Sequence, residues 1–341
     1  MIIKSIKLDN FRCHKEFNFD FKKKTSIIVG ENGSGKTSVL EAIYIALLGK
    51  SFRATDPDIL KRDSEFYRIE INFTNGEKTV VAYSLINGVL KKQFLVGEKK
   101  YLRLPKKYRY PIVLFLPDDL HLIGSSPTRK RDFFDRILGG LDDNYSNLLN
   151  RYEKALKQRN DLLKKYSEFN LDEVKNVIFS WNLLLAKYGV EIRKKRQEFI
   201  FEINNRLTET YRSIAENSDI LELEYQLQGE DISESEYLKR LEDELQRDLI
   251  LGHTGFGIHR DNYNFIFNNS DADGSASRGE VRSIILALKF IEAELIYEKT
   301  GKRPIVLLDD VFSELDETRQ KSLTSNFKDN QVIITSVDIV N

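Results

Sequence analysis

The stretch of sequence that decides the fold is GENGSGKT, residues 30–37. An apolar run at 26–29 precedes it and another at 38–48 follows, so we expect a buried strand, a glycine-rich loop and a helix. Glycines allow backbone N–H groups to close around a phosphate, and the helix N-terminus adds positive potential. The stretch is a complete Walker A motif, or P-loop.

Each position of this loop has an expected task in binding a nucleotide. The Lys36 ammonium is expected to reach the β- and γ-phosphates and to act in catalysis, and the Thr37 hydroxyl to bind Mg²⁺. The expected nucleotide contacts from the loop and the start of the helix are Gly30, Asn32, Gly33, Ser34, Gly35, Lys36, Thr37 and Ser38.

A second motif near the end of the chain matches the first. Residues 304–310 read PIVLLDD, which predicts a buried strand ending in two carboxylates. An apolar strand that ends in acidic residues is common, but behind a P-loop it predicts a Walker B motif. Asp309 is then expected to serve Mg²⁺, and Asp310 to polarise the attacking water as a catalytic residue. The chain contains no Asn-Lys-x-Asp guanine motif, which favours ATP over GTP.

Two shorter motifs flank the Walker B strand. Ser277 and Gly279 open a predicted helix in the segment SRGE, and SELD occupies residues 313–316. By themselves both are ordinary helix starts, with Ser277 as N-cap. In this order they match the signature motif and D-loop of ABC ATPases. Ser277 and Gly279 are therefore expected to contact ATP that is bound by a second subunit.

The remaining pattern predicts an α/β fold, an ABC-type P-loop ATPase head of mixed sheets and helices with an inserted α-helical hairpin domain. The head is split into residues 1–124 and 246–341, and the arm is 125–245. Asn-Gly pairs at 75–76 and 87–88 predict an antiparallel meander over 66–96. Helical periodicity predicts two long helices with a break near 167–170, the second spanning about 65 Å if unbroken from 172 to 215. Further expected elements are strands 2–8, 110–116, 221–227, 263–267, 305–308 and 332–335, and helices 235–251 and 280–298.

Composition limits the partners and the cellular compartment that the chain is expected to have. The chain has 341 residues, with 53 basic and 53 acidic side chains, so no global field attracts nucleic acid. One cysteine excludes an internal disulfide and fits the reducing cytoplasm. No apolar run is long enough to span a membrane, and no secretory signal is expected.

The chain resembles the RecF family, recombination and gap-repair ATPases of bacteria that are related to the SMC proteins. The matching segments are LDNFR (8–12), GKSFR (49–53), FLPDDL (115–120), RKRDFFD (129–135), GIHRD (257–261) and LDDVFSELD (308–316). The resemblance implies ATP and Mg²⁺ as cofactors, an ATP-dependent homodimer, double-stranded DNA at a gap or junction, a RecR-type partner, and roles in DNA repair, replication and the SOS response. It also implies that Arg12 contacts phosphates, with a surface arginine as the alternative; Arg53 has the same two interpretations.

The chain departs from the expected pattern at several positions. No glutamine follows strand 110–116, so Asp118 or Asp119 would take any Q-loop role. No histidine follows the last strand, so Thr335 or Ser336 would occupy the switch position, and both absences suit slow hydrolysis. Ile258 replaces a proline of the family motif, and His259 and Arg260 beside it are either site residues or a structural loop.

The sequence offers two candidate surfaces for contact with DNA. The densest basic stretch, with tyrosines between its members, is residues 91–109, and a charge run is also typical of a solvated face. A second candidate is the arm, with Lys154, Lys157, Arg159, Lys164 and Lys165. Rival functions are an ABC transporter subunit, a P-loop kinase and an ATP-gated scaffold that does not act on DNA.

Overall fold

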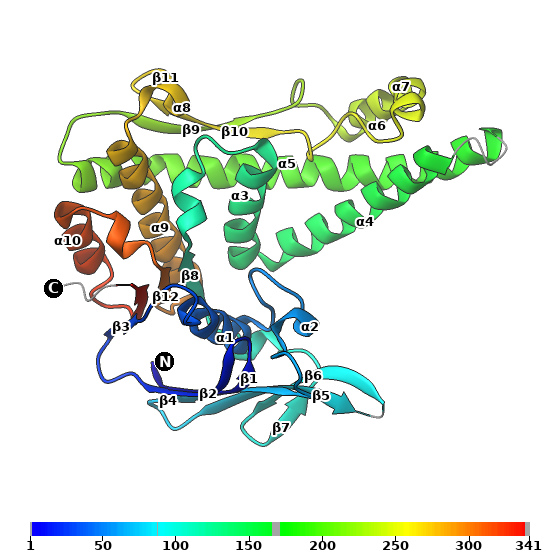
Figure 1. The fold of residues 1–341 in the computed structure, drawn as a ribbon. Helices are drawn as coiled ribbons and strands as arrows, with labels where there is room; N and C mark the ends of the chain where they lie inside the picture. Colours follow the sequence, from blue (N-terminus) through cyan, green and yellow to red (C-terminus); the bar gives the residue numbers. More distant parts are fainter. Residues whose placement is uncertain (1, 87, 166–170, 338–341) are drawn as a thin grey trace. The chain divides into compact units, whose positions relative to one another are not determined.

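The computed structural model describes residues 2–86, 88–165 and 171–337. The chain folds into two compact units, drawn in Figure 1. Unit 1 comprises residues 1–120 and 292–341, and unit 2 comprises residues 121–291. Each unit has its own secondary structure.

Unit 1 contains a parallel sheet of four strands in the order β3-β13-β12-β8. The strands are β3 (Thr25–Val29), β13 (Val332–Ser336), β12 (Ile305–Asp309) and β8 (Ile112–Phe115). Every residue of β8, β12 and β13 is buried, as expected for parallel strands covered on both faces. The carboxyl ends of β3 and β12 lead directly into the Walker A loop and the Walker B carboxylates.

The second sheet of unit 1 is antiparallel, with the order β2-β1-β4-β5-β6-β7. Its strands are β1 (Ile3–Phe11), β2 (His14–Asp20), β4 (Tyr67–Phe73), β5 (Lys78–Ile86), β6 (Val89–Val96) and β7 (Lys99–Tyr101). The predicted meander is confirmed, although Asn87 of its second turn lies outside the described residues. The sequence pattern did not predict β2, because its edge position leaves mostly polar, solvent-facing side chains.

Helix α1 (Lys36–Leu48) touches strands of both sheets. Its side chains from Val39 to Leu47 are buried on every side of the helix, which is the pattern of a helix enclosed by protein. The helix ends at Gly49, whose φ of 87° suits a glycine C-cap. The P-loop that precedes α1 is thereby anchored to the core of unit 1.

Shorter helices complete unit 1 and the link into unit 2. They are α2 (Asp56–Ile59), η1 (Lys106–Tyr108), η2 (Pro117–His121), η4 (Phe312–Glu314) and α10 (Glu317–Asn326). Asp316 caps α10 through a hydrogen bond from the Arg319 amide, 2.9 Å long, which is a standard N-cap.

Unit 2 is built on three helices, α3 (Pro127–Leu141), α4 (Asp143–Lys165) and α5 (Leu171–Ala215). The first predicted long helix is in fact α3 and α4. The break occurs because the Asp142 carboxylate accepts hydrogen bonds from the amides of Asn144 and Tyr145 and starts a new helix. Helix α5 runs unbroken for 45 residues, as predicted. The predicted break at 167–170 lies outside the described residues.

A three-stranded antiparallel sheet, β11-β10-β9, accompanies these helices. Its strands are β9 (Leu221–Gln226), β10 (Asn262–Phe267) and β11 (Ser270–Asp271), and the remaining helices are α6 (Glu234–Asp243), α7 (Leu245–Leu251), α8 (Ala272–Ser275) and α9 (Arg278–Thr300). The boundary between the units falls within α9, after Ile291. The predicted helix 235–251 is split into α6 and α7 at Glu244.

The unit boundaries differ from the predicted division. Residues 246–291, which we assigned to the head, belong to unit 2. The reason is a long-range pairing: β10 lies antiparallel to β9 over six residue pairs. A sequence pattern predicts each strand, but the identity of its partner depends on the tertiary structure.

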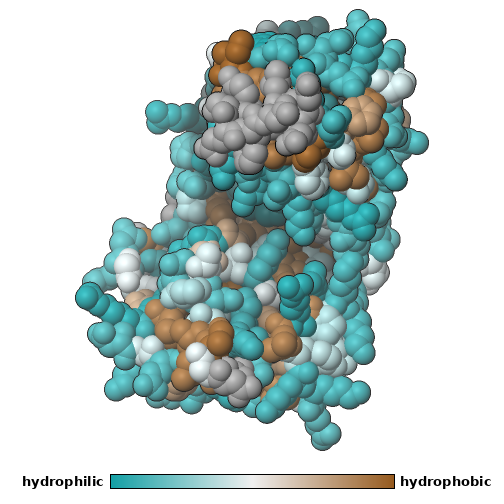
Figure 2. Space-filling model, turned by 90° about the vertical axis from the view of Figure 1, so that its right-hand side faces the viewer, coloured by the Kyte–Doolittle hydropathy of each residue, from teal (hydrophilic) through white to brown (hydrophobic). Residues whose placement is uncertain are grey.

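The surface drawn in Figure 2 is mostly hydrophilic, with hydrophobic side chains in separate patches. Among the described residues, the helices include none with the length and apolar character needed to cross a bilayer.

Candidate nucleotide site

The P-loop adopts a conformation that requires glycine. Gly33 and Gly35 have φ values of 83° and 94°, a region that residues with a Cβ rarely adopt. At Gly35 space is also lacking, since an added Cβ would lie 2.4 Å from both Cys13 Sγ and His14 Nε2. The loop therefore holds its backbone tightly around the N-terminus of α1, where amide groups point away from the helix.

Lys36 is the first residue of α1 and is largely buried. Its Nζ donates hydrogen bonds to the carbonyl oxygens of Gly30, at 2.6 Å, and Glu31, at 3.0 Å. The ammonium group thus connects the end of the loop to its first two residues.

Three side chains from distant parts of the chain converge next to the loop. The Thr37 hydroxyl donates to Asp309 Oδ1 at 2.8 Å, and the Thr335 hydroxyl donates to the same oxygen at 2.9 Å. The three residues come from the start of α1 and from the ends of β12 and β13. Thr335, one of two candidates for the switch position, therefore contacts the Walker B aspartate directly.

Asp309 is buried, and burial raises the pKa of its carboxyl group, while the hydrogen bonds from Thr37 and Thr335 oppose that shift. These two donors are neutral hydroxyls, so burial of the carboxylate is only partly compensated. Hydroxyl and carboxylate oxygens are the ligands that Mg²⁺ prefers. The pair Thr37 and Asp309 therefore fits a magnesium ion.

Asp310 follows with a backbone φ of 55°, which is uncommon for a residue other than glycine. Its amide donates to the Thr335 hydroxyl at 3.0 Å and approaches the Thr335 carbonyl at 3.2 Å. These contacts with Thr335 of β13 hold Asp310 in its uncommon backbone conformation.

Behind the loop, a carboxylate that the sequence analysis missed organises two predicted arginines. Glu41 of α1 is fully buried and accepts two hydrogen bonds from Arg12, at 2.9 and 2.7 Å, and two from Arg53, at 3.1 and 2.9 Å. The Ser51 hydroxyl adds a fifth at 2.6 Å. Burial alone would raise the pKa of Glu41, but these hydrogen bonds outweigh it and hold that pKa below its ordinary value. A glutamate inside an otherwise apolar helix was the available signal.

The signature segment lies in unit 2. Ser277 and Glu280 form a reciprocal cap at the start of α9: the Ser277 amide donates to the Glu280 carboxylate at 2.6 Å, and the Glu280 amide donates to the Ser277 hydroxyl at 3.3 Å. Gly279 lies in the first turn of α9. The segment is thus an ordered helix N-terminus.

The Q-loop candidates differ in exposure. Asp119 is buried in η2, and its Oδ2 accepts a hydrogen bond from the Leu116 amide at 3.1 Å. This bond caps the end of β8, and Asp118 beside it is more accessible.

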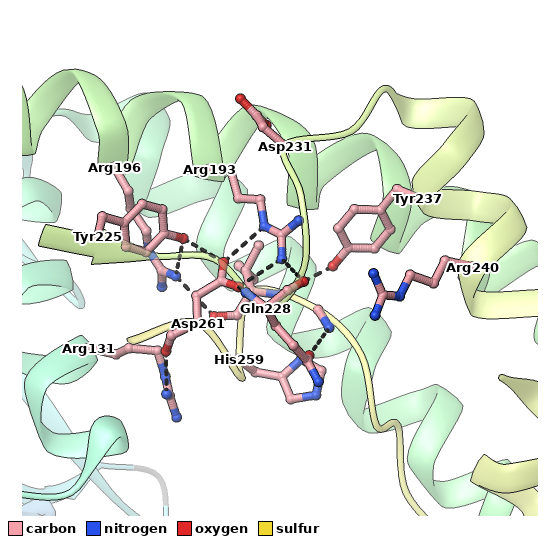
Figure 3. Close-up of polar contacts among 12 residues, drawn as sticks. Arg131, Arg193, Arg196, Tyr225, Gln228, Asp231, Tyr237, Arg240, His259 and Asp261 are labelled. Carbon is pink, nitrogen blue, oxygen red and sulfur yellow. Dashed lines mark hydrogen bonds and ion pairs between the residues drawn. The ribbon is translucent and has the colours of Figure 1, made fainter. Parts of the chain in front are cut away.

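The GIHRD motif is the centre of a buried polar network in unit 2, which Figure 3 shows. Asp261 accepts bonds from Arg193 at 2.9 and 2.8 Å, from the Tyr225 hydroxyl at 2.6 Å and from the Gln228 amide at 2.7 Å. His259 Nε2 donates to the Thr254 carbonyl at 3.1 Å, so the other ring nitrogen accepts from the Tyr152 hydroxyl. Burial lowers the pKa of His259 to about 4. The ring is therefore neutral at physiological pH, and these contacts fit the structural alternative.

The two basic regions that are candidates for DNA contact differ in the exposure of their side chains. In the stretch 91–109 the exposed basic side chains are Lys91, Lys99, Lys100, Arg103, Lys106, Lys107 and Arg109. In the arm, Arg159 is fully buried and donates to Asp248 at 2.7 Å. The prediction that Arg159 is a possible DNA contact is therefore wrong.

Taken together, the P-loop before α1, the Walker B carboxylates after β12 and the strand order of unit 1 define a class. The chain is an ABC-type ATPase with a large helical insertion.

Comparisons with known proteins confirm and sharpen this class. The family model "AAA ATPase domain" matches residues 1–337. The chain is 34% identical to the DNA replication and repair protein RecF of Ruminiclostridium cellulolyticum, covering 98% of this chain and 92% of that one. It is also 34% identical to RecF of Clostridioides difficile, with 99% and 92% coverage.

Solved structures of related proteins have the same fold as this chain. The structure of the recombination mediator protein RecF-ATP in the RecFOR pathway superposes with a TM-score of 0.84 at 29% identity, covering 100% of this chain and 93% of that chain. The Smc head domain from Pyrococcus furiosus, at 16% identity and a TM-score of 0.50 over 99% and 90% of the two chains, shares the fold. The chain belongs to the RecF family of DNA replication and repair ATPases.

Proposed function

We propose that this ATPase is an ATP-operated clamp on DNA: ATP binding joins two heads head to tail around duplex DNA, and slow hydrolysis releases them. The observation that carries the proposal is the convergence of Thr37, Asp309 and Thr335 beside the P-loop, with both hydroxyls within 2.9 Å of Asp309 Oδ1. The contact between Thr37 of the P-loop and Asp309 supports a single site for phosphate and magnesium.

Within one head, the P-loop amides and Lys36 hold the phosphates of ATP. The nucleotide contacts that we propose are Arg12, Gly30, Asn32, Gly33, Ser34, Gly35, Lys36, Thr37 and Ser38. Arg12 would act beside its ion pair with Glu41. Thr37 and Asp309 would hold Mg²⁺, which supplies charge neutralisation at the β- and γ-phosphates when bound.

Catalysis is assigned to Asp310 and Lys36. Asp310 is held at a strained φ by Thr335, and we propose that its carboxylate orients the attacking water. An aspartate reaches less far than a glutamate, so slow turnover is expected. Lys36 stabilises charge on the transferred phosphoryl group.

The dimer uses Ser277 and Gly279, which would meet the γ-phosphate held by the other copy. The ordered N-terminus of α9 supports this, because helix N-termini bind phosphate. Ser277→Arg should keep ATP binding by the monomer and abolish ATP-induced dimers. Dimers that persist in light scattering would reduce Ser277 to a helix cap.

DNA, gapped or at a junction, and a RecR-type mediator are the proposed partners, in keeping with the RecFOR pathway of the solved relative. The exposed lysines of residues 91–109 are the proposed duplex contact. With a single cysteine in the chain, we place the protein in the cytoplasm.

The clamp cycle is tested by DNA residence time. Asp310→Asn should bind ATP and dimerise but fail to turn over, so in excess Mg²⁺-ATP it should stay on duplex DNA longer than wild type. Dissociation rates from surface-bound duplex, with Lys36→Ala as the variant that does not load, measure this. Equal residence times for wild type and Asp310→Asn would refute release by hydrolysis.

A further inference from the structure

The turn between β1 and β2 lies directly against the P-loop. The Cys13 thiol donates to the Ser34 carbonyl at 3.7 Å, and His14 Nε2 lies 3.1 Å from the Gly35 carbonyl. A carbonyl oxygen only accepts, so His14 Nε2 carries the proton in this contact. Two consecutive carbonyls of the loop are thus bound from the same turn.

Binding a carbonyl also fixes an amide. In a planar trans peptide the C=O and N–H groups point in opposite directions. The Ser34 carbonyl shares its peptide with the Gly35 amide, and the Gly35 carbonyl shares its peptide with the Lys36 amide. The contacts from Cys13 and His14 therefore orient two of the amides that a P-loop offers to a phosphate.

The Gly35 carbonyl is also held by α1, since it accepts from the amides of Ser38, at 2.9 Å, and Val39, at 3.3 Å. The His14 ring adds a third hydrogen bond to the Gly35 carbonyl, from outside the helix. The turn leaves no room at Gly35, where an added Cβ would meet both Cys13 Sγ and His14 Nε2 at 2.4 Å. The loop is consequently held both by the turn between β1 and β2 and by the amides of α1.

The turn is itself rigidly mounted. The Arg12 amide donates to the Ile59 carbonyl at 2.9 Å, and the Arg12 side chain is paired with Glu41. Lys61 Nζ donates to the Cys13 carbonyl at 3.0 Å. The His14 ring packs on Phe17 with centroids 4.9 Å apart. Displacement of His14 or Cys13 is therefore resisted by α1, by α2 and its following loop, and by β2.

We propose that Cys13 and His14 are positioning residues for ATP binding, which hold the Gly35 and Lys36 amides toward the nucleotide phosphates. The inference rests on the proposed function, because it assumes that the P-loop binds ATP. Amides that hold phosphates in both the ground and transition states alter affinity and leave turnover at saturation unchanged.

His14→Phe keeps a ring against Phe17 but removes the donor, and His14→Gln restores a donor at a similar reach. A neutral hydrogen bond contributes about 1 kcal/mol, so His14→Phe should weaken the Kd for Mg²⁺-ATP about fivefold. We expect His14→Gln within about twofold of wild type and kcat at saturating ATP unchanged for both. The matched control is His253→Phe, a histidine of unit 2 that is half-buried, as His14 is, and whose ring contacts the Leu251 carbonyl.

Isothermal titration calorimetry of the full chain with Mg²⁺-ATP measures these Kd values. Melting temperatures without nucleotide first show that each variant is folded. Equal Kd values for His14→Phe and wild type, or equal weakening in the Phe and Gln variants, would overturn the role of His14. If Lys36→Ala also bound ATP like wild type, the P-loop assignment itself would fail, which separates the two hypotheses.

Cys13 is tested independently, since it is the only cysteine in the chain and is exposed. N-ethylmaleimide adds bulk at Sγ and should weaken Mg²⁺-ATP binding of wild type, while Cys13→Ala treated in the same way should show no change on treatment. Unchanged affinity of fully alkylated wild type, verified by mass spectrometry, would exclude Cys13 from the proposed role.

Discussion

The nucleotide site of unit 1 and the GIHRD network of unit 2 are built from the same kinds of residue and serve different ends. Around Asp261, an arginine, a tyrosine hydroxyl and a backbone amide all converge on one carboxylate, which is fully buried. Around Asp309, the hydrogen bonds come from the neutral hydroxyls of Thr37 and Thr335, and the pKa of the carboxyl group is raised. The first arrangement is internally compensated, and the second calls for a cation.

This contrast shows how a motif can be assigned a role. A charged cluster that neutralises itself stabilises a fold, whereas one that leaves its charge uncompensated at a loop of amides is prepared for a ligand. Glu41 shows that both occur within unit 1, since its two arginines lower its pKa while Asp309 has the opposite shift.

The greatest change is expected from breaking the network of unit 2. Asp261→Ala leaves Arg193 buried without its carboxylate, which should cost about 3–5 kcal/mol of stability. The single tryptophan, Trp181, lies in α5, so urea unfolding followed by its fluorescence reports on unit 2. Asp231→Ala, at an exposed position near the same network, is the control. A loss below about 1 kcal/mol, the size of one ordinary hydrogen bond, would contradict the structural role.

Asp310→Asn should have nearly as large an effect, but on catalysis. Loss of the residue that orients the attacking water should lower kcat about a hundredfold or more, with ATP affinity and Trp181-reported stability unchanged. Steady-state phosphate release measures turnover, and Asp329→Asn, an exposed aspartate of unit 1, should behave as wild type. Full turnover in Asp310→Asn would move the catalytic role to another side chain.

A smaller effect should distinguish Asp309 from Glu41, two of the buried carboxylates of unit 1, by the pH dependence of stability. Asp309 has a raised pKa in the folded state, so its ionisation costs stability as pH rises above the unfolded value. Asp309→Asn should therefore raise the melting temperature near neutral pH, and the difference should vanish below about pH 4. Melting without nucleotide across this range is the measurement.

Glu41 should behave in the opposite sense. Its pKa is lowered on folding, so its stabilisation is complete above the unfolded value and is lost as pH falls through the folded one. Glu41→Gln should lower the melting temperature near neutral pH and lose less stability than wild type on acidification. Parallel pH profiles for Asp309→Asn and Glu41→Gln would contradict the assignment of both groups.

The smallest effect concerns the surface. Changing Lys99, Lys100, Lys106 and Lys107 to Gln should flatten the salt dependence of DNA binding by up to about 0.9 for each phosphate that is no longer neutralised. A matched variant with Lys22, Lys23 and Lys24 changed to Gln tests whether any exposed lysine run suffices. An unchanged slope in the first variant would direct attention to Lys154 and Lys157 of the arm.

Local patterns were sufficient for much of this molecule. The glycines and Lys36 of residues 30–37 predicted the loop and the start of α1, because a strand, a tight turn and a helix follow from neighbouring residues. The Asn-Gly pairs predicted the meander for the same reason. Helix α5 and the Walker B strand were likewise predictable from periodicity and apolar runs.

Tertiary structure decided the contacts between remote segments. Nothing near Glu41 in the sequence specifies Arg12 and Arg53 as its partners, and nothing near Asp309 specifies Thr335. The division into units was also not predictable from the sequence pattern, since it depends on the pairing of β10 with β9. The physical reason is common to these cases: hydrophobic periodicity and turn chemistry act over a few residues, whereas a buried charge is satisfied by whichever partner the packed fold brings within about 3 Å.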